Sequence, residues 1–466
     1  MKNFALIPGL LLLSACSFAP DYYRPELPVP TAWDAISPSV QQAEGAVWGD
    51  MGWTAFFPDK GLQGLIQTAL QHNRDLRVAV LNIDAARAAY RVTEADLLPR
   101  VDAGLSESAQ RIPQALSQSI SKQARVSHQY NANLAVTAFE LDLFGRLRSL
   151  NQQALETYLA TEAARDATRI ALIAEVANAY VTLLGDRTQL SLAESTLDTR
   201  LRTLELIERR LDVGMSNALD RAQARTAVES ARASLARYTR LVEQDRNALQ
   251  LLVGAPVVGG TLPATLDGMV LVEDLPVGLP SEVLLRRPDV MQAEHALKAA
   301  NANIGAARAA FFPRISLTAM FGLASPALSN LFEVDSRVWS FAPGVTFPIF
   351  DAGRNEATLA ASKANRDIAV ARYEKAIQSA FREVSDGLAA RRTLVDQAEA
   401  QKALADAAAT SLRLSDARYR QGIDNYLAVL DAQRTLCDAQ QSLIQVQVQR
   451  LSNLVSLYKA LGGGRA

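Results

Sequence analysis

The chain has 466 residues, 49% of them hydrophobic but only 6% aromatic, and its 48 basic residues balance 49 acidic ones. A net charge near zero provides no basic field and argues against a nucleic-acid partner. The few cysteines and histidines are scattered without metal-ligand spacing, so we expect no metal and no cofactor other than a covalent lipid. The abundance of Ala, Leu, Arg and Gln favours long helices over a β-sandwich or an α/β enzyme.

The N-terminus has the three parts of a secretory signal. Lys2 is followed by an apolar run and then by Leu-Ser-Ala before Cys16. Small residues before a cysteine also resemble the bacterial lipoprotein box, which implies removal of residues 1–15 and a lipid such as palmitate on Cys16. In such lipoproteins Ser17, in place of Asp, implies sorting to the outer membrane. A generic signal with an incidental cysteine is the alternative. No other run approaches about 18 apolar residues, so we expect no transmembrane helix.

The sequence contains a tandem duplication. Positions 210–225 read RLDVGMSNALDRAQAR, positions 418–433 read RYRQGIDNYLAVLDAQ, and the match continues at the same offset in both directions. A duplicated unit explains this better than chance, and its period is too long for a solenoid. The expected organisation is a signal (1–15), an extended segment (16–61), a first repeat (62–254), an extended connector (255–275) and a second repeat with the C-terminal tail (276–466).

Each repeat begins with a helix and two strands. Residues 62–97 carry apolar side chains on a 3.6-residue stripe and predict one helix, which Pro99 ends. Segments that begin at Val101 and Tyr130 alternate apolar and polar residues and predict strands. The second repeat has RISLTAMFGL and VWSFAPGVTFPIF in the same places.

A long helix, a sharp turn and a shorter returning helix complete each repeat. Residues 146–212 and 354–420 contain no proline and have the spacing of coiled coils. Gly214 reverses the chain in the first repeat and Gly422 in the second, and Gly254 closes the first returning helix.

Four strands per chain limit the possible membrane structures. Strands of about ten residues can span an outer membrane if every edge is paired, and the smallest closed barrels have about eight strands. A spanning barrel therefore requires more than one chain. A protein whose short sheets bury one face, an ordinary soluble α+β fold, is the alternative.

Several motifs together resemble the outer membrane factor family, the TolC/OprM/NodT-type channel lipoproteins of tripartite efflux systems. They are CSFAPDYYRPELPVP from Cys16, WTAFFPDKGLQGLIQTALQHNRDL from Trp53, RPDV from Arg287, FFPRISL from Phe311 and RYRQGIDNYLAVLDAQRTL from Arg418. The resemblance covers essentially the whole mature chain. It implies a mainly α fold with a β-barrel: a TolC-like homotrimer in which a 12-stranded transmembrane β-barrel is continuous with a 12-helix periplasmic α-barrel.

The resemblance also implies a function and partners. The protein would be the outer membrane channel of an efflux pump for drugs or other small toxic compounds, with most of the chain in the periplasm. Its partners would be a periplasmic membrane fusion (adaptor) protein and an inner-membrane RND-type pump. An exit duct for type I protein secretion and a structural coiled-coil lipoprotein without a pore are the alternatives. No nucleophile elbow or phosphate loop occurs, so we expect no enzyme.

The resemblance assigns roles to residues near the two turns. The expected adaptor contacts are Val213, Gly214, Met215, Gln421, Gly422 and Ile423. The expected gate consists of the acidic pore residues Asp220 and Asp431, the apolar constriction Leu427, and the tethering residues Arg418 and Tyr419. A ring of carboxylates in a narrow pore attracts cations. A solvated helix face, with Asp220 paired to Arg221 or Arg225, is the plainer interpretation.

Overall fold

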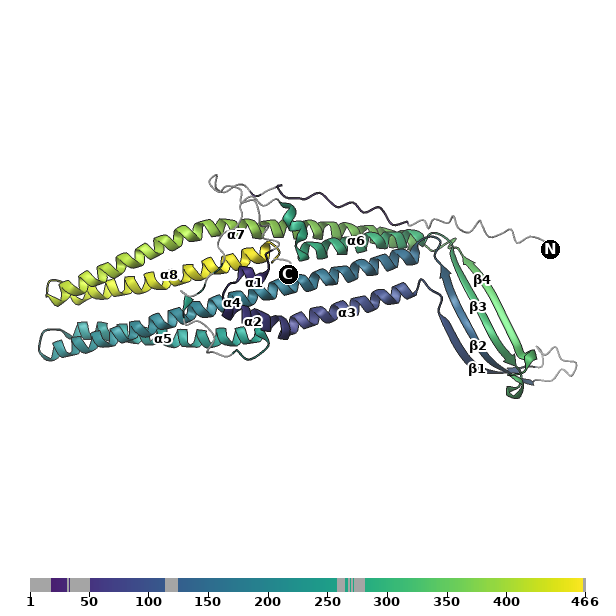
Figure 1. Cartoon of the computed structure of the whole chain (residues 1–466), viewed down its shortest axis with the longest axis horizontal. Helices are drawn as coiled ribbons and strands as arrows, with labels where there is room; N and C mark the ends of the chain where they lie inside the picture. The colour runs from purple at the N-terminus through teal and green to yellow at the C-terminus, as the bar shows by residue number, and fades with distance from the viewer. Residues whose placement is uncertain are drawn as a thin grey trace. The chain divides into compact units, whose positions relative to one another are not determined.

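The computed structural model describes residues 18–31, 33, 51–113, 125–257, 265, 266, 269, 271 and 281–463 (Figure 1). Cys16 lies outside these residues. The elements in chain order are α1 (Trp53–Phe56), α2 (Lys60–His72), α3 (Arg74–Ala95), β1 (Val101–Ile112), β2 (Arg125–Leu141), α4 (Arg146–Asp212), α5 (Ala218–Val253), η5 (Ser281–Arg286), α6 (Pro288–Ala309), β3 (Arg314–Ser325), η6 (Leu328–Asn330), η7 (Val334–Ser336), β4 (Arg337–Thr346), α7 (Arg354–Arg420) and α8 (Tyr426–Ala460).

The chain forms two compact units. The strand unit comprises Met1–Glu26, Asn82–Glu162 and Gln292–Tyr373, and it contains the four strands found among the described residues. The hairpin unit comprises Leu27–Leu81, Ala163–Met291 and Glu374–Ala466, and it contains both helical turns. Helices α4 and α7 contribute residues to both units, and their bounds are those predicted from the sequence.

The strand unit contains one antiparallel sheet. Its four strands are ordered β1-β2-β3-β4. Each repeat supplies two neighbouring strands, and β2 of the first repeat pairs with β3 of the second. Within the described chain, β1 and β4 each pair on one side only. The sheet is therefore open, with a row of backbone donors and acceptors along each outer edge.

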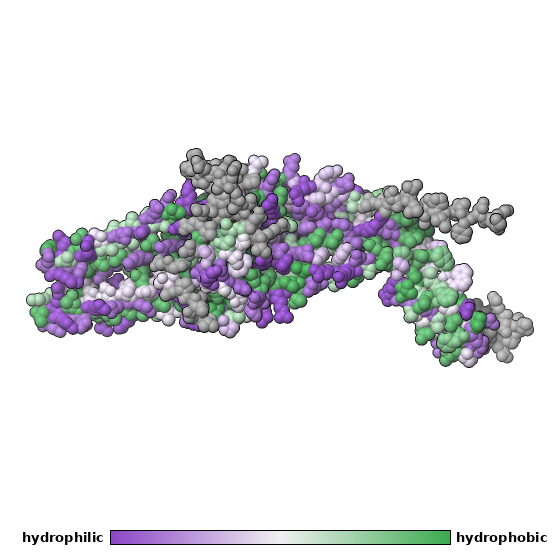
Figure 2. Space-filling model, viewed as in Figure 1, coloured by the Kyte–Doolittle hydropathy of each residue, from purple (hydrophilic) through white to green (hydrophobic). Residues whose placement is uncertain are grey.

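The two faces of this sheet differ in chemistry. The strand register places Leu134 beside Phe321 and Phe321 beside Trp339 on one face, and Trp339 is 73% exposed. On the opposite face Asn133 lies beside Gly322. Hydrophobic side chains gather over the strands on the side of the protein that Figure 2 shows. The predicted alternation of apolar and polar residues is thus confirmed, but the apolar face is exposed and not buried in a core.

The hairpin unit has a conventional core. Tyr180, Leu183 and Leu184 on α4 are fully buried, as is Tyr458 near the end of α8. The ring of Phe56 stacks on that of Tyr458 at 4.5 Å, which holds the short helix α1 against α8. Aromatic and aliphatic burial of this kind supplies most of the stability of such a unit.

One sequence prediction was wrong: residues 62–97 do not form a single helix. Asn73 leaves the helical conformation (φ −63°, ψ 133°) and separates α2 from α3. Its N–H closes α2 by donating to the carbonyl of Ala69 (2.8 Å), while its side-chain oxygen begins α3 by accepting from the N–H of Leu76 (2.9 Å). Its amide nitrogen donates to the carbonyl of Leu252 at 2.9 Å. One asparagine therefore caps two helices and binds the end of a third.

Helix α4 contains the one described stretch that could cross a membrane by its length and composition alone. Half of that stretch is buried inside the protein. Core helices that are apolar around most of their circumference have the same composition.

Candidate functional site

The two helical hairpins end in turns with the same backbone geometry. Gly214 and Gly422 have φ values of 78° and 75°. The N–H of the following residue closes each long helix by donating to a carbonyl of its last turn, at 2.7 Å from Met215 and 3.0 Å from Ile423. Only glycine adopts this left-handed conformation without strain. The repeated glycine is therefore explained by the shape of the turn.

Each returning helix also begins in the same way. The side chain of Asn217 accepts a hydrogen bond from the N–H of Asp220 (2.9 Å), and that of Asn425 accepts one from the N–H of Ala428 (3.3 Å). Asparagine at this position satisfies one of the free N–H groups of the first helical turn. Both repeats thus have the glycine that ends the long helix and the asparagine that begins the returning helix.

The six residues expected to contact an adaptor are all exposed. They are Val213, Gly214, Met215, Gln421, Gly422 and Ile423. Met215 is 79% exposed, and a side chain added at either glycine would meet no atom within 4 Å. Exposed apolar side chains at a turn favour contact with another surface.

Arg418, one of the expected gate residues, has a partner within its own hairpin. Its Nε donates to Oδ2 of Asp424 at 2.6 Å and its Nη2 donates to Oδ1 at 3.0 Å. The hydrogen bonds from Arg418 lower the pKa of Asp424, and those to Asp424 raise the pKa of Arg418. This bidentate pair spans the turn from the last helical turn of α7 to the residue before the Asn425 cap.

Tyr419 lies between the two hairpins. Its ring is 4.9 Å from the guanidinium carbon of Arg210, on α4, and 5.6 Å from the ring of Tyr426, on α8. Tyr426 is only 2% exposed and packs with Ile207 on α4 and Val429 on α8. Burial raises the pKa of the Tyr426 hydroxyl to about 12. Tyr419 therefore connects the hairpin of the first repeat to that of the second.

Of the remaining gate candidates, Leu427 and Asp431 are exposed and Asp220 is partly buried. Leu427 is 56% exposed. Asp431 accepts a hydrogen bond from Nη2 of Arg434 at 3.2 Å, and both side chains are largely exposed. Asp220 accepts one from the hydroxyl of Ser216 at 3.0 Å. Within the described residues, the alternative pairing of Asp220 with Arg221 or Arg225 does not occur.

Sequence reasoning missed three residues of this cluster: Arg210, Asp424 and Tyr426. One signal could have identified Asp424, because the duplication aligns it with Ser216 and so places a carboxylate in the second turn only. Arg210 aligns with Arg418. The first turn has Ser216 where the second has Asp424, and the guanidinium of Arg210 stacks on the ring of Tyr419. The two hairpins are alike in backbone but differ in side-chain chemistry.

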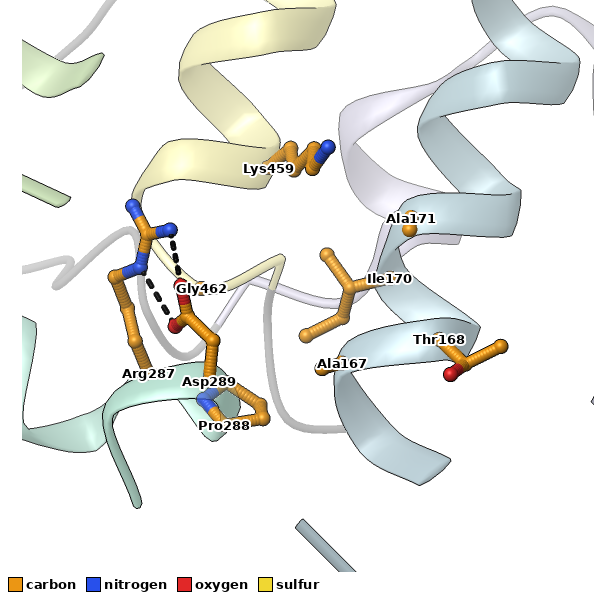
Figure 3. Close-up of a pocket in the computed structure, with 9 residues that line it drawn as sticks. All are labelled: Ala167, Thr168, Ile170, Ala171, Arg287, Pro288, Asp289, Lys459 and Gly462. Carbon is orange, nitrogen blue, oxygen red and sulfur yellow. Dashed lines mark hydrogen bonds and ion pairs between the residues drawn. The ribbon is translucent and has the colours of Figure 1, made fainter. Parts of the chain in front are cut away.

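A second feature of the hairpin unit is a pocket of about 300 Å³ beside Arg287 (Figure 3). Arg287 is 5% exposed; its Nη2 lies 2.7 Å from Asp289 and 2.8 Å from Glu383, and its Nη1 donates to the carbonyl of Ala460 at 2.8 Å. Burial opposes its charge, but the two carboxylates outweigh burial and raise the pKa of Arg287. The side chain therefore joins the start of α6 to α7 and to the end of α8.

Most of the residues that line this pocket are small or apolar. Besides the paired Arg287 and Asp289, the charged residue that lines it is Lys459. The other walls come from small or apolar residues of α4, such as Ile170, and from Pro288 and Gly462 (Figure 3). Across the described part of the chain, no three His, Cys, Asp or Glu side chains are grouped so that they could hold a metal ion.

Comparison with known proteins identifies close relatives. The family model described as outer membrane efflux protein matches the chain twice, at residues 65–255 and 279–463. Two relatives from Pseudomonas putida, the antibiotic efflux pump outer membrane protein ArpC and the toluene efflux pump outer membrane protein TtgC, are each 52% identical to it over 457 residues. Each alignment covers 97% of this chain and 93% of the relative.

A solved structure matches the fold over almost its whole length. The outer membrane channel MtrE of Neisseria gonorrhoeae, in its open state, superposes with a TM-score of 0.86 at 41% identity, and covers 96% of this chain and 98% of its own. The two separate matches of the family model agree with the duplication seen in the sequence.

Proposed function

Because this chain belongs to the outer membrane efflux protein family, we propose that it is the outer membrane channel of a tripartite efflux pump and conducts small toxic compounds out of the cell. The family and the relatives are channel proteins, and the protein is an outer membrane protein as they are. The rest of the proposal concerns its assembly, gate, partners and cargo.

The open sheet with an exposed apolar face is the observation that supports a channel most directly. Such a face suits lipid, whereas the free edges of β1 and β4 would be very costly there unless another strand pairs with each. Copies of the chain that pair β1 with β4 would close a barrel with its polar face inward. Three copies would provide 12 strands, within the size range of outer membrane barrels. We therefore propose a homotrimer.

The repeated hairpin tips suit a ring of partner hairpins. A trimer would present six tips with the same backbone and exposed apolar residues such as Met215 and Ile423. A glycine at each tip leaves room for close approach. We propose that a periplasmic adaptor docks there and connects the channel to an inner-membrane RND-type pump.

The gate is proposed near the tips of both hairpins, with Asp220 on α5 as one of its acidic pore residues. Tyr419, held by Arg210 and Tyr426, would fix the position of α7 relative to α4, and Arg418, held by Asp424, would fix the end of α7 against its own turn. Leu427 and Asp431, on an exposed face of α8, would then form an apolar ring and an acidic ring in the trimer. Three carboxylates around one aperture would favour cations over anions.

The relatives support a small-molecule cargo over a secreted protein. Their names specify toluene and antibiotics, and neither names an exported protein. The tube itself would suit either cargo, because the inner-membrane partner selects what enters. A structural coiled-coil lipoprotein without a pore would need no apolar sheet face.

Cys16 is proposed to carry a lipid, and the residues that follow it support an anchored N-terminus. The ring of Phe18 stacks on that of Phe312 at 4.5 Å, at the turn between α6 and β3. Farther along, Arg24 forms an ion pair of 2.9 Å with Glu294 on α6. The N-terminal segment thus lies along α6 and leads toward the strands, where a lipid could enter the same membrane.

Single-channel recording in planar bilayers tests the proposal. The purified wild-type protein should form cation-selective pores, and Asp431→Ala should weaken that selectivity. Asp198→Ala, which removes an exposed carboxylate on α4 paired with Arg202, is the matched control and should behave like the wild type. Absence of any pore from correctly folded protein would refute the channel. Cross-linking in detergent that stopped at the dimer would refute the trimer.

A further inference from the structure

The hairpin unit contains a pair of acidic side chains that the gate does not use. Asp186, on α4, and Asp245, on α5, share a hydrogen bond, and both are partly buried. Two carboxyl groups can share a hydrogen bond only if one of them carries a proton. Oδ2 of Asp245 is buried and accepts no hydrogen bond from the described residues. The pair therefore lies in a site that disfavours two negative charges.

The surroundings of the pair include an opposite charge. Arg237, on α5, faces Asp186, and its guanidinium carbon is 5.5 Å from the ring centre of Tyr238. Burial raises the pKa of Asp186, and burial together with the charge of Asp186 raises the pKa of Asp245 to about 7. The α8 residues that line the adjoining hollow of about 220 Å³ are Ile444, Gln445, Val448 and Gln449, none of which is charged.

Three helices meet closely at this point. A side chain added at Gly185 on α4 would overlap the side chain of Val448 on α8, so Val448 packs directly against the backbone of α4 at this glycine. Gln189, one turn farther along α4 and 3% exposed, donates to the carbonyl of Gln441 on α8 at 3.0 Å. A change in the spacing of α4 and α5 would therefore be transmitted to α8, because close packing leaves little room to absorb it.

One proton neutralises this site better than a divalent cation does. With Arg237 beside them, two ionised carboxylates leave a net charge of about −1, which a single shared proton cancels. A divalent cation would lie beside a guanidinium, and the pair provides fewer oxygen ligands than calcium normally takes.

We propose that Asp186 and Asp245 form a proton-dependent latch that holds α5 and α8 against α4. When the shared proton is lost, two like charges face each other in a half-buried site and push α5 away from α4. Linkage gives the direction of the pH dependence. A carboxyl that binds its proton more tightly in the closed state stabilises that state at low pH, and this stabilisation disappears as the pH rises toward about 7. A channel with loosened hairpins would open more readily at its tips. This effect on opening rests on the proposed channel function, whereas the latch itself does not.

Hydrogen exchange of the full-length protein in detergent tests the latch. Between about pH 5.5 and about pH 8, after correction for intrinsic exchange, amides of α5 and of residues 444–449 in the wild type should lose at least about tenfold in protection, since a difference of one pH unit is worth tenfold. Asp245→Asn, which keeps a donor for Asp186 but cannot ionise, should show no such loss. Asp198→Asn is the exposed control and should behave like the wild type.

The outcomes separate the latch from its alternatives. Equal pH dependence in the wild type and Asp245→Asn would overturn the latch. Protection restored at about pH 8 by calcium in the wild type, but not in Asp245→Asn, would also overturn it by identifying a metal site. If Asp245→Asn fails to fold, infrared spectroscopy of the wild type decides instead: the band of a buried protonated carboxyl should be present at the lower pH and lost at the higher. Conductance that stays constant while exchange changes would separate the latch from channel opening.

Discussion

Replacing Arg287 by methionine should destabilise the hairpin unit by a predictable amount. The substitution keeps much of the side-chain volume but removes the guanidinium that binds Asp289, Glu383 and the carbonyl of Ala460. Removing one member of a buried ion pair usually costs about 3–5 kcal/mol, because the other member stays buried without a partner.

The structure reduces that figure. The side chains of Asp289 and Glu383 remain 44% and 42% exposed, so water can solvate them once Arg287 is gone. We therefore assign about 1–2 kcal/mol to the lost pairs and about 1 kcal/mol to the carbonyl of Ala460, which loses a donor. For a unit of this size, a total of about 2–3 kcal/mol corresponds to a fall in the midpoint of thermal unfolding of roughly 5–10 °C.

Helical circular dichroism of the detergent-solubilised protein measures that midpoint. Arg382→Gln provides the control, because Arg382 lies 3.9 Å from Asp386, both side chains are about three-quarters exposed, and the expected loss is below about 0.5 kcal/mol. If Arg287→Met lowers the midpoint no more than Arg382→Gln does, the buried pair contributes no more than a surface pair and the reasoning fails.

Three further outcomes are expected. Burial opposes ionisation of Glu294, but hydrogen bonds from basic side chains lower its pKa. The ionised carboxylate therefore stabilises the attachment of the N-terminal segment at neutral pH, and this stabilisation is lost below about pH 4. Glu294→Gln should free the segment for proteolysis already at neutral pH. The double change Arg418→Ala and Tyr419→Ala removes the guanidinium bound by Asp424 and the ring that contacts Arg210 and Tyr426, so it should raise single-channel conductance without harming assembly. Unchanged conductance would locate the gate elsewhere. Cys16→Ser should abolish incorporation of radioactive palmitate, whereas normal labelling would rule out this anchor.

Much of the fold follows from local chemistry and was therefore predictable from the sequence. The bounds of α4 and α7, the reversals at Gly214 and Gly422 and the alternation within the strands each depend on residues close together in the chain. Comparing the sequence with itself also identified the duplication, which the two matches of the family model support. The positions of the tip residues followed from the same comparison.

What only the tertiary structure decided involves partners far apart in the chain. The break at Asn73 depends partly on its bond to Leu252, and an asparagine within a periodic apolar stripe does not by itself predict a break. The neighbours of Tyr419 and the meeting of Asp186 with Asp245 likewise depend on how separate helices pack. Helical periodicity predicts which face of a helix is buried, but the residue that this face meets is determined by helix packing, because the spacing within one helix contains no information about the register of the next.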